Sequence, residues 1–349
     1  MEHLDFLKRL LEAAAPSGFE ARAARVWTDE AREFSSVRGD AYGNVFATIN
    51  AERGLPIMLS GHLDEIGLMI AHVGDDGFVR FKGIGGWDAQ VLPGQRVRVL
   101  AKDGDLIGVV GRKPVHLMQG DERDAAAKLK DLWLDFGLEG EALKERVRVG
   151  DVGVLEQPVL ELGDGRLVSK ALDNRVGAFV VLEALRRLSA TTCLHQVTAV
   201  GATQEEIGAH GAGVAAHALE PKLAIVVDVT YESAQPGVDE FDVGVAPFGS
   251  GANITFSALT HPKLNALALE VAAKHGIKTS SSAFPRATGT DADTIAVTRA
   301  GVPCLVLAVP LRYMHSPSEM VDLRDIEAVI ALITELCLSL PGDFDFARV

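Results

Sequence analysis

Two adjacent glutamates, Glu205 and Glu206, stand where an apolar run gives way to glycines in the segment "VGATQEEIGAHGAG". Neighbouring carboxylates repel each other unless a cation lies between them or one of them holds a proton. A solvated surface turn would explain a short acidic pair without any chemistry. The pair therefore points to a functional site only if other ligand-type side chains come to the same place.

Further side chains of the kind that bind metal ions stand where other apolar runs end. His62 and Asp64 follow "LPIMLSG", Asp228 lies near the end of "KLAIVVDVT", and His315 closes "VPCLVLAVPLRYMH". Asp173 heads a helical segment after "SKAL". In an open α/β sheet, ligands bind beyond the carboxyl ends of the strands, so we expect these side chains to converge at one edge of the sheet. A lone buried histidine or aspartate usually only satisfies a hydrogen bond, but a convergent set marks a site.

The residue types favour a centre of two divalent metal ions. Imidazole and carboxylate suit zinc and similar ions, and a catalytic ion keeps three protein ligands and an open position for water. Five ligands can serve two ions if one acid bridges them. We expect Asp173 to be that bridge, with one histidine and one further acid completing each set: His62 with Asp228, and His315 with Glu206. Zinc, cobalt and manganese all accept such ligands.

This assignment leaves two carboxylates with other roles. Glu205 is not needed as a ligand, so it can act as general base towards a water whose pKa two metal ions lower from 15.7 towards about 7. Asp64 is placed to accept the second ring N–H of His62 and so to fix the tautomer of that histidine. The adjacent glutamates then tolerate each other, because Glu206 neutralises a cation while Glu205 exchanges a proton.

Four apolar runs predict the strands that carry these residues, at 55–62, 196–206, 222–230 and 302–315. Runs that are apolar on both faces suit buried, mainly parallel strands, and helical segments at 174–190 and 323–340 would cover the sheet. The segment 65–166 differs, with short alternating stretches and the turn signals "GDDG" and "KDGD". We therefore predict a mainly parallel α/β sandwich formed by residues 1–64 and 167–349, with a small β-rich unit inserted at 65–166.

Composition narrows the classes of partner. The chain has 349 residues, 48% of them hydrophobic, and a net charge of -14, which disfavours nucleic acid and anionic membranes. No run has the length and purity of a membrane span, and residues 1–20 read as a folded helix without the apolar core of a signal peptide. Cys193, Cys304 and Cys337 are widely separated in apolar contexts, which fits buried thiols in a reducing cytoplasm. Residues 341–349 are expected to form a loosely held tail.

Sequence motifs of other enzyme classes are incomplete in this chain or absent from it. Gly211–Ala216, "GAGVAA", matches a dinucleotide fingerprint with Asp228 at the distance of a ribose-binding acid, which would make an oxidoreductase. However, "QEEIGAH" separates these glycines from their strand, so close helix packing explains them better. Ser250 in "FGSGA" lacks the first glycine of a nucleophile elbow, and H-E-x-x-H is absent. His210, one helical turn beyond Glu206, is an alternative ligand.

Several of these segments, taken in order, resemble a known family. They are "GHLDEIGLMI", "KALDNRVGA", "ATQEEIGAHGA", "VVDVT", "ATGTDADTIAV" and "RYMHSPSEMV", together with "IGGWDAQVLPGQRV" and "LDFG" in the inserted unit. This set is similar to that of the di-metal aminopeptidases of the tetrahedral (TET) family, which includes glutamyl aminopeptidases and proteins historically labelled endoglucanase M. The resemblance spans nearly the whole chain.

The resemblance implies a catalytic α/β domain, an inserted PDZ-like β-barrel used for dimerisation, and hydrolysis of N-terminal residues from short peptides. It implies zinc or cobalt at the five predicted ligands, with Glu205 as general base. It also implies dimers that build a tetrahedral twelve-subunit particle with inward-facing active sites, so we expect a homo-oligomer. The apolar stretch at 83–92, "GIGGWDAQVL", is expected to bury surface against a neighbouring subunit.

Two positions depart from the family pattern. Asn174 stands where relatives often carry a second aspartate, and His210 where they often carry arginine, so the charge at the rim of the site is expected to differ. Neither is a ligand in this scheme. A related di-metal carboxypeptidase or deacylase stays open as the alternative, because one metal core can serve several amide substrates.

Overall fold

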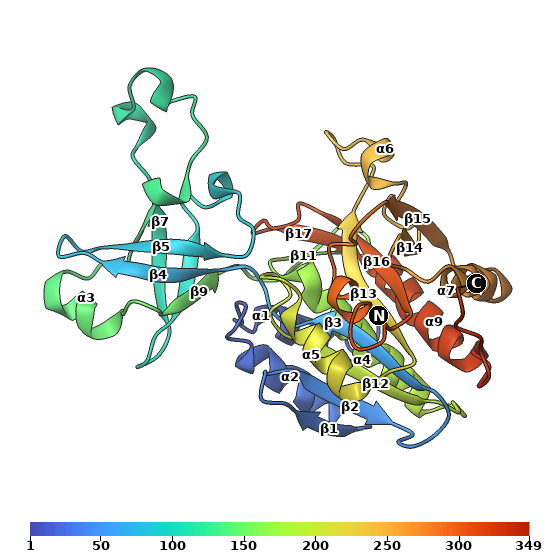
Figure 1. Ribbon diagram of the computed structural model, residues 1–349. Coiled ribbons are helices and arrows are strands. Elements are labelled where there is room, and N and C mark those ends of the chain that lie inside the picture. Colours follow the sequence, from blue (N-terminus) through green and yellow to red (C-terminus); the bar gives the residue numbers. More distant parts are fainter. Residues whose placement is uncertain (349) are drawn as a thin grey trace.

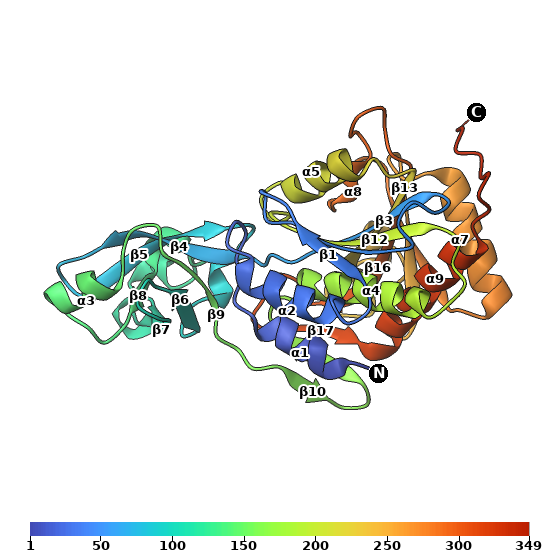
Figure 2. The ribbon, with the colours of Figure 1, turned by 90° about the horizontal axis from the view of Figure 1, so that it is seen from below.

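A large α/β unit and a separate β-barrel, joined by two linkers, make up the structure (Figure 1). This computed structural model describes residues 1–348. The barrel lies to one side of the α/β unit in both views (Figures 1 and 2). Within the described residues, no helix combines the length and apolar character needed to cross a membrane.

The centre of the large sheet consists of four parallel strands, which correspond to the four apolar runs of the sequence. In spatial order they are β12 (Gln196–Ala202), β3 (Pro56–His62), β13 (Leu223–Tyr231) and β16 (Cys304–Arg312). Nearly every residue of these strands is buried, as expected for strands covered on both faces. The predicted parallel α/β sheet is confirmed, and its carboxyl ends meet at one edge.

Further strands that the sequence did not reveal extend the sheet on both sides. They are β1 (Ser36–Gly39) and β2 (Val45–Ile49) beside β12; β17 (Glu319–Asp322), β11 (Arg166–Ser169) and β10 (Leu160–Leu162) beyond β16; and β14 (Ala252–Ser257), which pairs antiparallel with β16 and parallel with β15 (Thr279–Phe284). These strands are short, and several are exposed, so they lack the continuous apolar runs of the centre.

Helices cover both faces of the sheet, which confirms the predicted sandwich (Figure 2). One face carries α1 (Leu4–Glu12), α2 (Ala21–Ala31), α4 (Leu172–Ser189) and α9 (Leu323–Ser339), and α7 (Pro262–His275) packs on α9 and β14. The other face carries α5 (His210–Leu219) and α8 (Ala292–Ile295), whereas α6 (Glu240–Val243) lies on a projecting loop. Helix α4 is buried almost throughout, and the Trp27 indole N–H donates to the carbonyl of Ala178 at 2.9 Å.

The inserted segment folds into a closed antiparallel barrel of six strands. In barrel order these are β4 (Gly67–Val73), β5 (Phe78–Ile84), β8 (Trp133–Asp135), β7 (Leu106–Gly111), β6 (Arg96–Leu100) and β9 (Val152–Leu155). Helix α3 (Gly140–Arg146) and 3-10 turns at Ala89–Val91, Val115–Leu117, Gly120–Glu122 and Leu129–Asp131 lie between them. The predicted hairpin turns "GDDG" and "KDGD" join β4 to β5 and β6 to β7.

Part of the apolar stretch at 83–92 is buried within the barrel itself. Ala89 and Leu92 belong to the barrel core, Ile84 is buried, and the Trp87 indole N–H donates to the Gly67 carbonyl at 2.8 Å. The expected contact of this stretch with a neighbouring subunit stays a prediction. An apolar sequence indicates that its side chains are buried, but it does not show whether they are buried within their own domain or against another subunit. The predicted boundary at residue 166 stays a prediction, although β10 pairs with the large sheet rather than with the barrel.

A buried ion network fixes the outgoing linker, which leads from β3 to the barrel. Glu65, just after β3, accepts from the Lys170 ammonium at 2.7 Å and from the Arg175 guanidinium at 3.1 Å. All three side chains are at most 7% exposed. Because Lys170 follows β11 and Arg175 lies in α4, one carboxylate ties the outgoing linker to the α/β unit beside the edge of the sheet.

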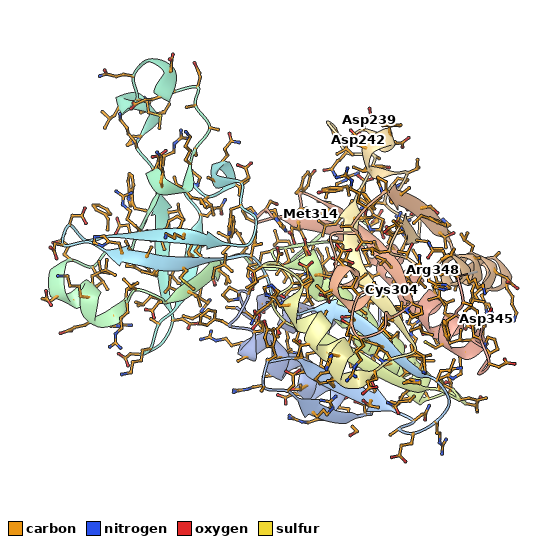
Figure 3. The ribbon with its side chains drawn as sticks, in the orientation of Figure 1. Asp239, Asp242, Cys304, Met314, Asp345 and Arg348 are labelled. Carbon is orange, nitrogen blue, oxygen red and sulfur yellow. The ribbon has the colours of Figure 1, made fainter. Side chains whose placement is uncertain are left out.

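Residues 341–348 are held by the rest of the α/β unit, which corrects the expected loose tail over this part; Val349 lies outside the described residues. Phe344 and Phe346 pack against the main core, and a His261 ring nitrogen lies 3.0 Å from the Phe346 carbonyl oxygen. Asp345 and Arg348, labelled in Figure 3, contact Lys263 and the carbonyls of the 258–260 loop. The tail sequence is short and polar, and two phenylalanines suffice to anchor it. The three cysteines are free and buried, as predicted.

A close approach between β3 and α4 leads to a stability prediction. A Cβ added at Gly61 would lie 2.5 to 2.7 Å from backbone atoms of Gly177 and Ala178. We therefore expect Gly61→Ala to lower the free energy of unfolding by about 1–3 kcal/mol, as overpacking of a filled core does. Urea denaturation measures the change. Gly342→Ala, where a Cβ meets nothing within 4 Å, is the control, and equal stabilities of the two variants would contradict the prediction.

Candidate metal centre

A cleft of about 420 Å³ opens at the carboxyl ends of the central strands. Its walls include five of the seven predicted site residues, namely Asp173, Glu205, Glu206, Asp228 and His315. His62 and Asp64 lie directly beneath them and are almost completely buried. All seven residues therefore meet at one place, as the rule for parallel sheets requires.

His62 closes β3 with both ring nitrogens aimed at acids. Its Nε2 lies 3.3 Å from Asp173 Oδ1 and 3.7 Å from Glu205 Oε2, and it has no hydrogen-bond partner. Its Nδ1 lies 3.3 Å from Asp64 Oδ1, which is the contact expected from the sequence. A buried imidazole nitrogen without a hydrogen-bond partner, facing carboxylates, suits the binding of a cation.

Two groups of side chains can each hold a metal ion. One comprises His62, Asp173 and Asp228, and the other comprises Asp173, Glu206 and His315; within each group the ligand atoms lie within 4.8 Å of one another. Asp173 belongs to both, which is the bridging arrangement derived from the sequence. The residues present therefore fit two divalent ions.

The spacing of the second group agrees with metal binding. His315 Nε2 lies 3.4 Å from Asp173 Oδ2 and 3.4 Å from Glu206 Oε2, and Glu206 Oε1 is buried without a partner. These separations are long for hydrogen bonds. Two atoms bound to one tetrahedral zinc at 2.0–2.1 Å lie about 3.4 Å apart, so the same separations suit two ligands of one ion.

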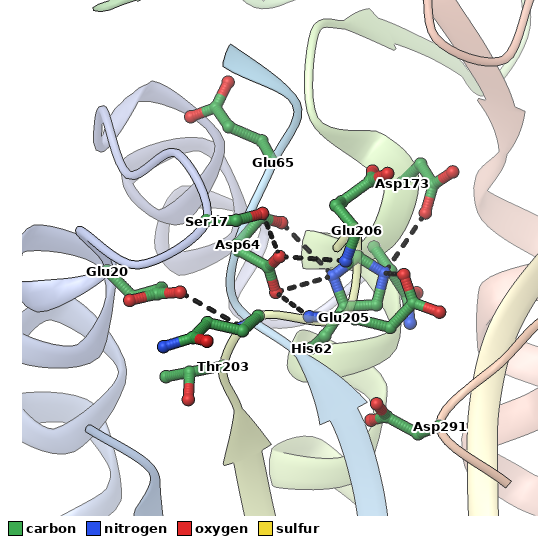
Figure 4. A network of polar contacts seen from close by, with 12 residues as sticks. Ser17, Glu20, His62, Asp64, Glu65, Asp173, Thr203, Glu205, Glu206 and Asp291 are labelled. Atoms are coloured by element: carbon green, nitrogen blue, oxygen red, sulfur yellow. Dashed lines mark hydrogen bonds and ion pairs between the residues drawn. The ribbon is translucent and has the colours of Figure 1, made fainter. Parts of the chain in front are cut away.

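Asp64 orders the glutamate pair as well as His62 (Figure 4). Its two carboxylate oxygens accept from the backbone N–H groups of Glu205 and Glu206 at 3.0 and 3.1 Å, and Ser17 Oγ donates to it at 2.5 Å. Glu20 accepts from the preceding backbone N–H, that of Gln204, at 3.1 Å. The turn that carries the pair is thus fixed by buried acids rather than by a helix or strand.

The crowding of charge shifts the protonation of the whole cluster. Burial raises the pKa of Glu205 to about 8 and raises the pKa of Asp228 well above its usual range. Burial alone would lower the pKa of His315, but the neighbouring carboxylates of Asp173 and Glu206 raise it to about 11. The same opposition of burial and acidic partners raises the pKa of His62. Without a cation these groups share protons, and binding a cation would release them.

Several residues that contact the site were missed by the sequence reasoning. Ser17, Glu20 and Asp291 are nearly or fully buried, and Asp291 accepts from Ser60 Oγ at 2.9 Å. Burial raises the pKa of Asp291 to about 6. The segment "ATGTDADTIAV" was noticed as a unit but offered no reason to single out one of its acids. Ser17 and Glu20 follow no strand, so no pattern connected them to the site.

The alternative roles considered for nearby residues do not fit the geometry. His210 is exposed at the start of α5 and belongs to neither metal group. Asn174 is buried, its side-chain N–H donates to the Val227 carbonyl and its side-chain oxygen accepts from the Gly177 N–H, so its place is structural; the expected difference in charge at the rim stays a prediction. A Cβ at Gly211 would collide with the Thr203 carbonyl. This glycine therefore serves close packing, and the dinucleotide interpretation is wrong.

Fold and site together define an α/β enzyme with a histidine–carboxylate cluster at the carboxyl edge of its sheet and a β-barrel inserted beside that cluster. The model of one protein family, described as M42 glutamyl aminopeptidase, matches residues 43–332. The chain belongs to this M42 family and is therefore a hydrolase of the aminopeptidase class. The family predicted from the sequence is confirmed.

Individual relatives agree over almost their full lengths. The lysyl aminopeptidase of Pyrococcus furiosus is 34% identical over 350 residues, which cover 97% of this chain and 98% of that protein. A TET aminopeptidase structure from the marine sediment archaeon Thaumarchaeota archaeon SCGC AB-539-E09 has a TM-score of 0.92 at 31% identity, covering 97% and 96%. The Pyrococcus horikoshii TET1 peptidase, described as able to assemble into a tetrahedron or a large octahedral shell, has a TM-score of 0.85 at 29% identity, covering 97% and 99%.

Proposed function

We propose that this protein is a di-metal aminopeptidase that removes N-terminal residues from short peptides. The observation that carries the proposal is the pair of three-ligand groups that share Asp173, with Glu205 beside them. Their ligands are His62, Asp173, Asp228, Glu206 and His315. The nitrogen and oxygen donors favour zinc or cobalt, and manganese also accepts them. Buried thiols at all three cysteines support a reducing, cytoplasmic location.

The chain's own residues have distinct tasks in this reaction. When held by these five residues, divalent ions would supply Lewis-acid polarisation of the scissile carbonyl and would acidify water. Glu205 Oε2, 3.7 Å from His62 Nε2 and on the cleft wall, takes a proton from the attacking water and passes it to the leaving amine. Asp64 positions Glu205 through the backbone N–H and orients His62 through Nδ1. The carboxylate of Glu205 needs a pKa near the working pH, and its burial supports that role.

The two glutamates should respond differently to the same change. In metal-stripped protein reloaded with zinc or cobalt, we expect Glu205→Gln to keep the metal content of the wild type and to lose about a hundredfold or more in turnover, because a general base is removed. Glu206→Gln should lose metal, because a ligand is weakened. Elemental analysis and hydrolysis of aminoacyl chromogenic substrates give the two measurements.

Controls separate this proposal from its alternatives. N-acetylated substrates should be resistant, since a deacylase or carboxypeptidase would accept a blocked amino terminus. Full activity of metal-free wild-type protein would refute the metal centre. If Glu205→Gln lost an ion while Glu206→Gln kept the wild-type content, the two roles would be reversed.

The charge of the cleft points to the class of N-terminal residue that is accepted. None of the residues that line the cleft, all within the described chain, is lysine or arginine, whereas five are carboxylates. Even two divalent ions would supply only four positive charges. Asp293 lies on the wall away from the ligand groups, held by the Gly289 N–H at 2.9 Å and by Thr288. An acidic substrate side chain would therefore meet no cation of the protein and one additional acid.

We accordingly expect poor cleavage of acidic N-terminal residues, despite the family's description. Glutamyl and aspartyl substrates should show kcat/KM values lower than those of lysyl, leucyl and methionyl substrates by about tenfold or more, since each 1.4 kcal/mol of repulsion is a factor of ten. A panel of aminoacyl p-nitroanilides with the reloaded enzyme measures this. Asp293→Asn removes one negative charge from the cleft, so it should reduce the difference in kcat/KM between lysyl and leucyl substrates. A preference for glutamyl substrates would contradict the charge argument.

We further propose that the unit at 65–166 mediates dimerisation, while 1–64 and 167–349 form the catalytic unit. The barrel stands away from the α/β unit (Figure 1) and contributes none of the proposed ligands. On its outer surface Ile107, Val109 and Leu117 are 43%, 48% and 65% exposed. Such apolar exposure suits contact with another copy of the chain. Assembly of these dimers into a tetrahedral dodecamer would admit only short peptides to the cleft.

Light scattering tests the assembly. We expect a particle of twelve subunits of 37.1 kDa for the metal-loaded protein. Val109→Asp should reduce its mass, because a charge would be buried in the dimer contact. Leu194→Asp, at a 76% exposed position of the α/β unit, should not. A monomeric wild type would refute assembly, and a stable dimer would refute only the particle.

A further inference from the structure

Glu319 links two ligand-bearing segments that are distant in the sequence. It is the first residue of β17 and is 2% exposed. Its Oε1 accepts from the backbone N–H of His315 at 2.8 Å, and its Oε2 accepts from the backbone N–H of Asp173 at 3.0 Å. Both bonded residues belong to the group Asp173, Glu206 and His315. One carboxylate thus fixes the backbone of two of the three members of that group.

The topology makes this link necessary. Strand β17 lies between β16, whose following turn carries His315, and β11, whose continuation leads to Asp173. At both places the backbone leaves regular structure. His315 has a φ of 58°, in the left-handed region that residues other than glycine rarely adopt, and Asp173 departs from helical geometry at the head of α4. Such conformations persist only where surrounding contacts determine them.

We infer that Glu319 is a positioning residue for the second metal group, which rests on the proposed di-metal function. It is not itself a ligand, because both of its oxygens accept backbone N–H groups and neither belongs to a metal group. Its carboxylate provides two acceptor oxygens at a fixed spacing, and so sets the distance between the Asp173 and His315 backbones. Glutamine offers one acceptor and one donor group, so it can satisfy only one of the two N–H groups.

The structure contains a matched control for a purely structural role. Asp325 is fully buried and also accepts two backbone N–H groups, from Gly249 and Gly251, each at 2.8 Å. Neither glycine lines the cleft or belongs to a metal group. Asp325→Asn therefore removes the same kind of paired acceptor from a buried site without touching the ligands. If Glu319 only stabilises the fold, Glu319→Gln and Asp325→Asn should lower the free energy of unfolding by similar amounts and should both leave metal binding unchanged.

Cobalt binding by metal-stripped protein distinguishes the two roles. Titration with Co²⁺, followed by visible absorption and by elemental analysis after gel filtration, should give two ions per subunit in the wild type. In Glu319→Gln we expect the first ion to bind with nearly unchanged affinity and the second to bind about 10- to 100-fold more weakly, as is usual when a residue that orients ligands is lost. Asp325→Asn should bind both as the wild type does. Thermal unfolding of each metal-free form measures the structural cost separately.

Two results of the titration would overturn the inference. One is that Glu319→Gln binds both Co²⁺ ions with wild-type affinity. The other is that Glu319→Gln and Asp325→Asn lose affinity for Co²⁺ to the same extent. If Glu319→Gln does not fold, Glu319→Asp is titrated instead, because it keeps two acceptor oxygens but withdraws them by one methylene; failure of both to fold would assign Glu319 to folding alone. Wild-type protein that binds no Co²⁺ would refute the proposed metal centre itself, which separates that failure from failure of Glu319.

Discussion

The concentration of negative charge at one edge of the sheet constrains everything around it. Asp173, Glu205, Glu206 and Asp228 line a single cleft, and two histidines lie between them. Such a cluster is tolerable only with protons or cations inside it, and its pKa values record that competition. Parallel strands bring the acids together, but parallel topology alone would leave them to turn outward into water. Buried hydrogen bonds hold them against their mutual repulsion.

Asp64 and Glu65, which follow β3, make two different sets of these hydrogen bonds. Asp64 turns inward and fixes His62 and the backbone of the glutamate pair, whereas Glu65 bonds Lys170 and Arg175 at the base of the barrel. The outgoing linker to the barrel therefore begins one residue after Asp64, which orders the candidate site. The start of this linker and the turn that carries the glutamate pair are held by adjacent residues of the chain.

The sequence predicted the parts of the molecule that depend on long, uniform patterns. Runs that are apolar on both faces identified the four parallel strands, and the acids at their ends followed from the topology rule. Short flanking strands such as β14 and β15 escaped because polar residues interrupt their sequences, "ANITFS" and "TSSSAF", so neither shows a continuous apolar run. Glu319 and Ser17 escaped for another reason, since their importance lies in contacts with residues more than 40 positions away. The sequence also does not show which surface buries an apolar stretch, as the stretch at 83–92 illustrates.

Backbone conformation shows that the site is organised by the protein itself. Of the ten non-glycine residues with positive φ in the described chain, five lie within three positions of a proposed ligand: Ala171, Gln204, Ala209, Tyr313 and His315. Each such conformation costs free energy, and it persists only when other contacts compensate. Those contacts are the carboxylates Glu20, Asp64 and Glu319, which accept the backbone N–H groups of the same turns. The side chains of the candidate site are thus gathered by hydrogen bonds of the protein itself, so the free-energy cost of ordering them is met on folding.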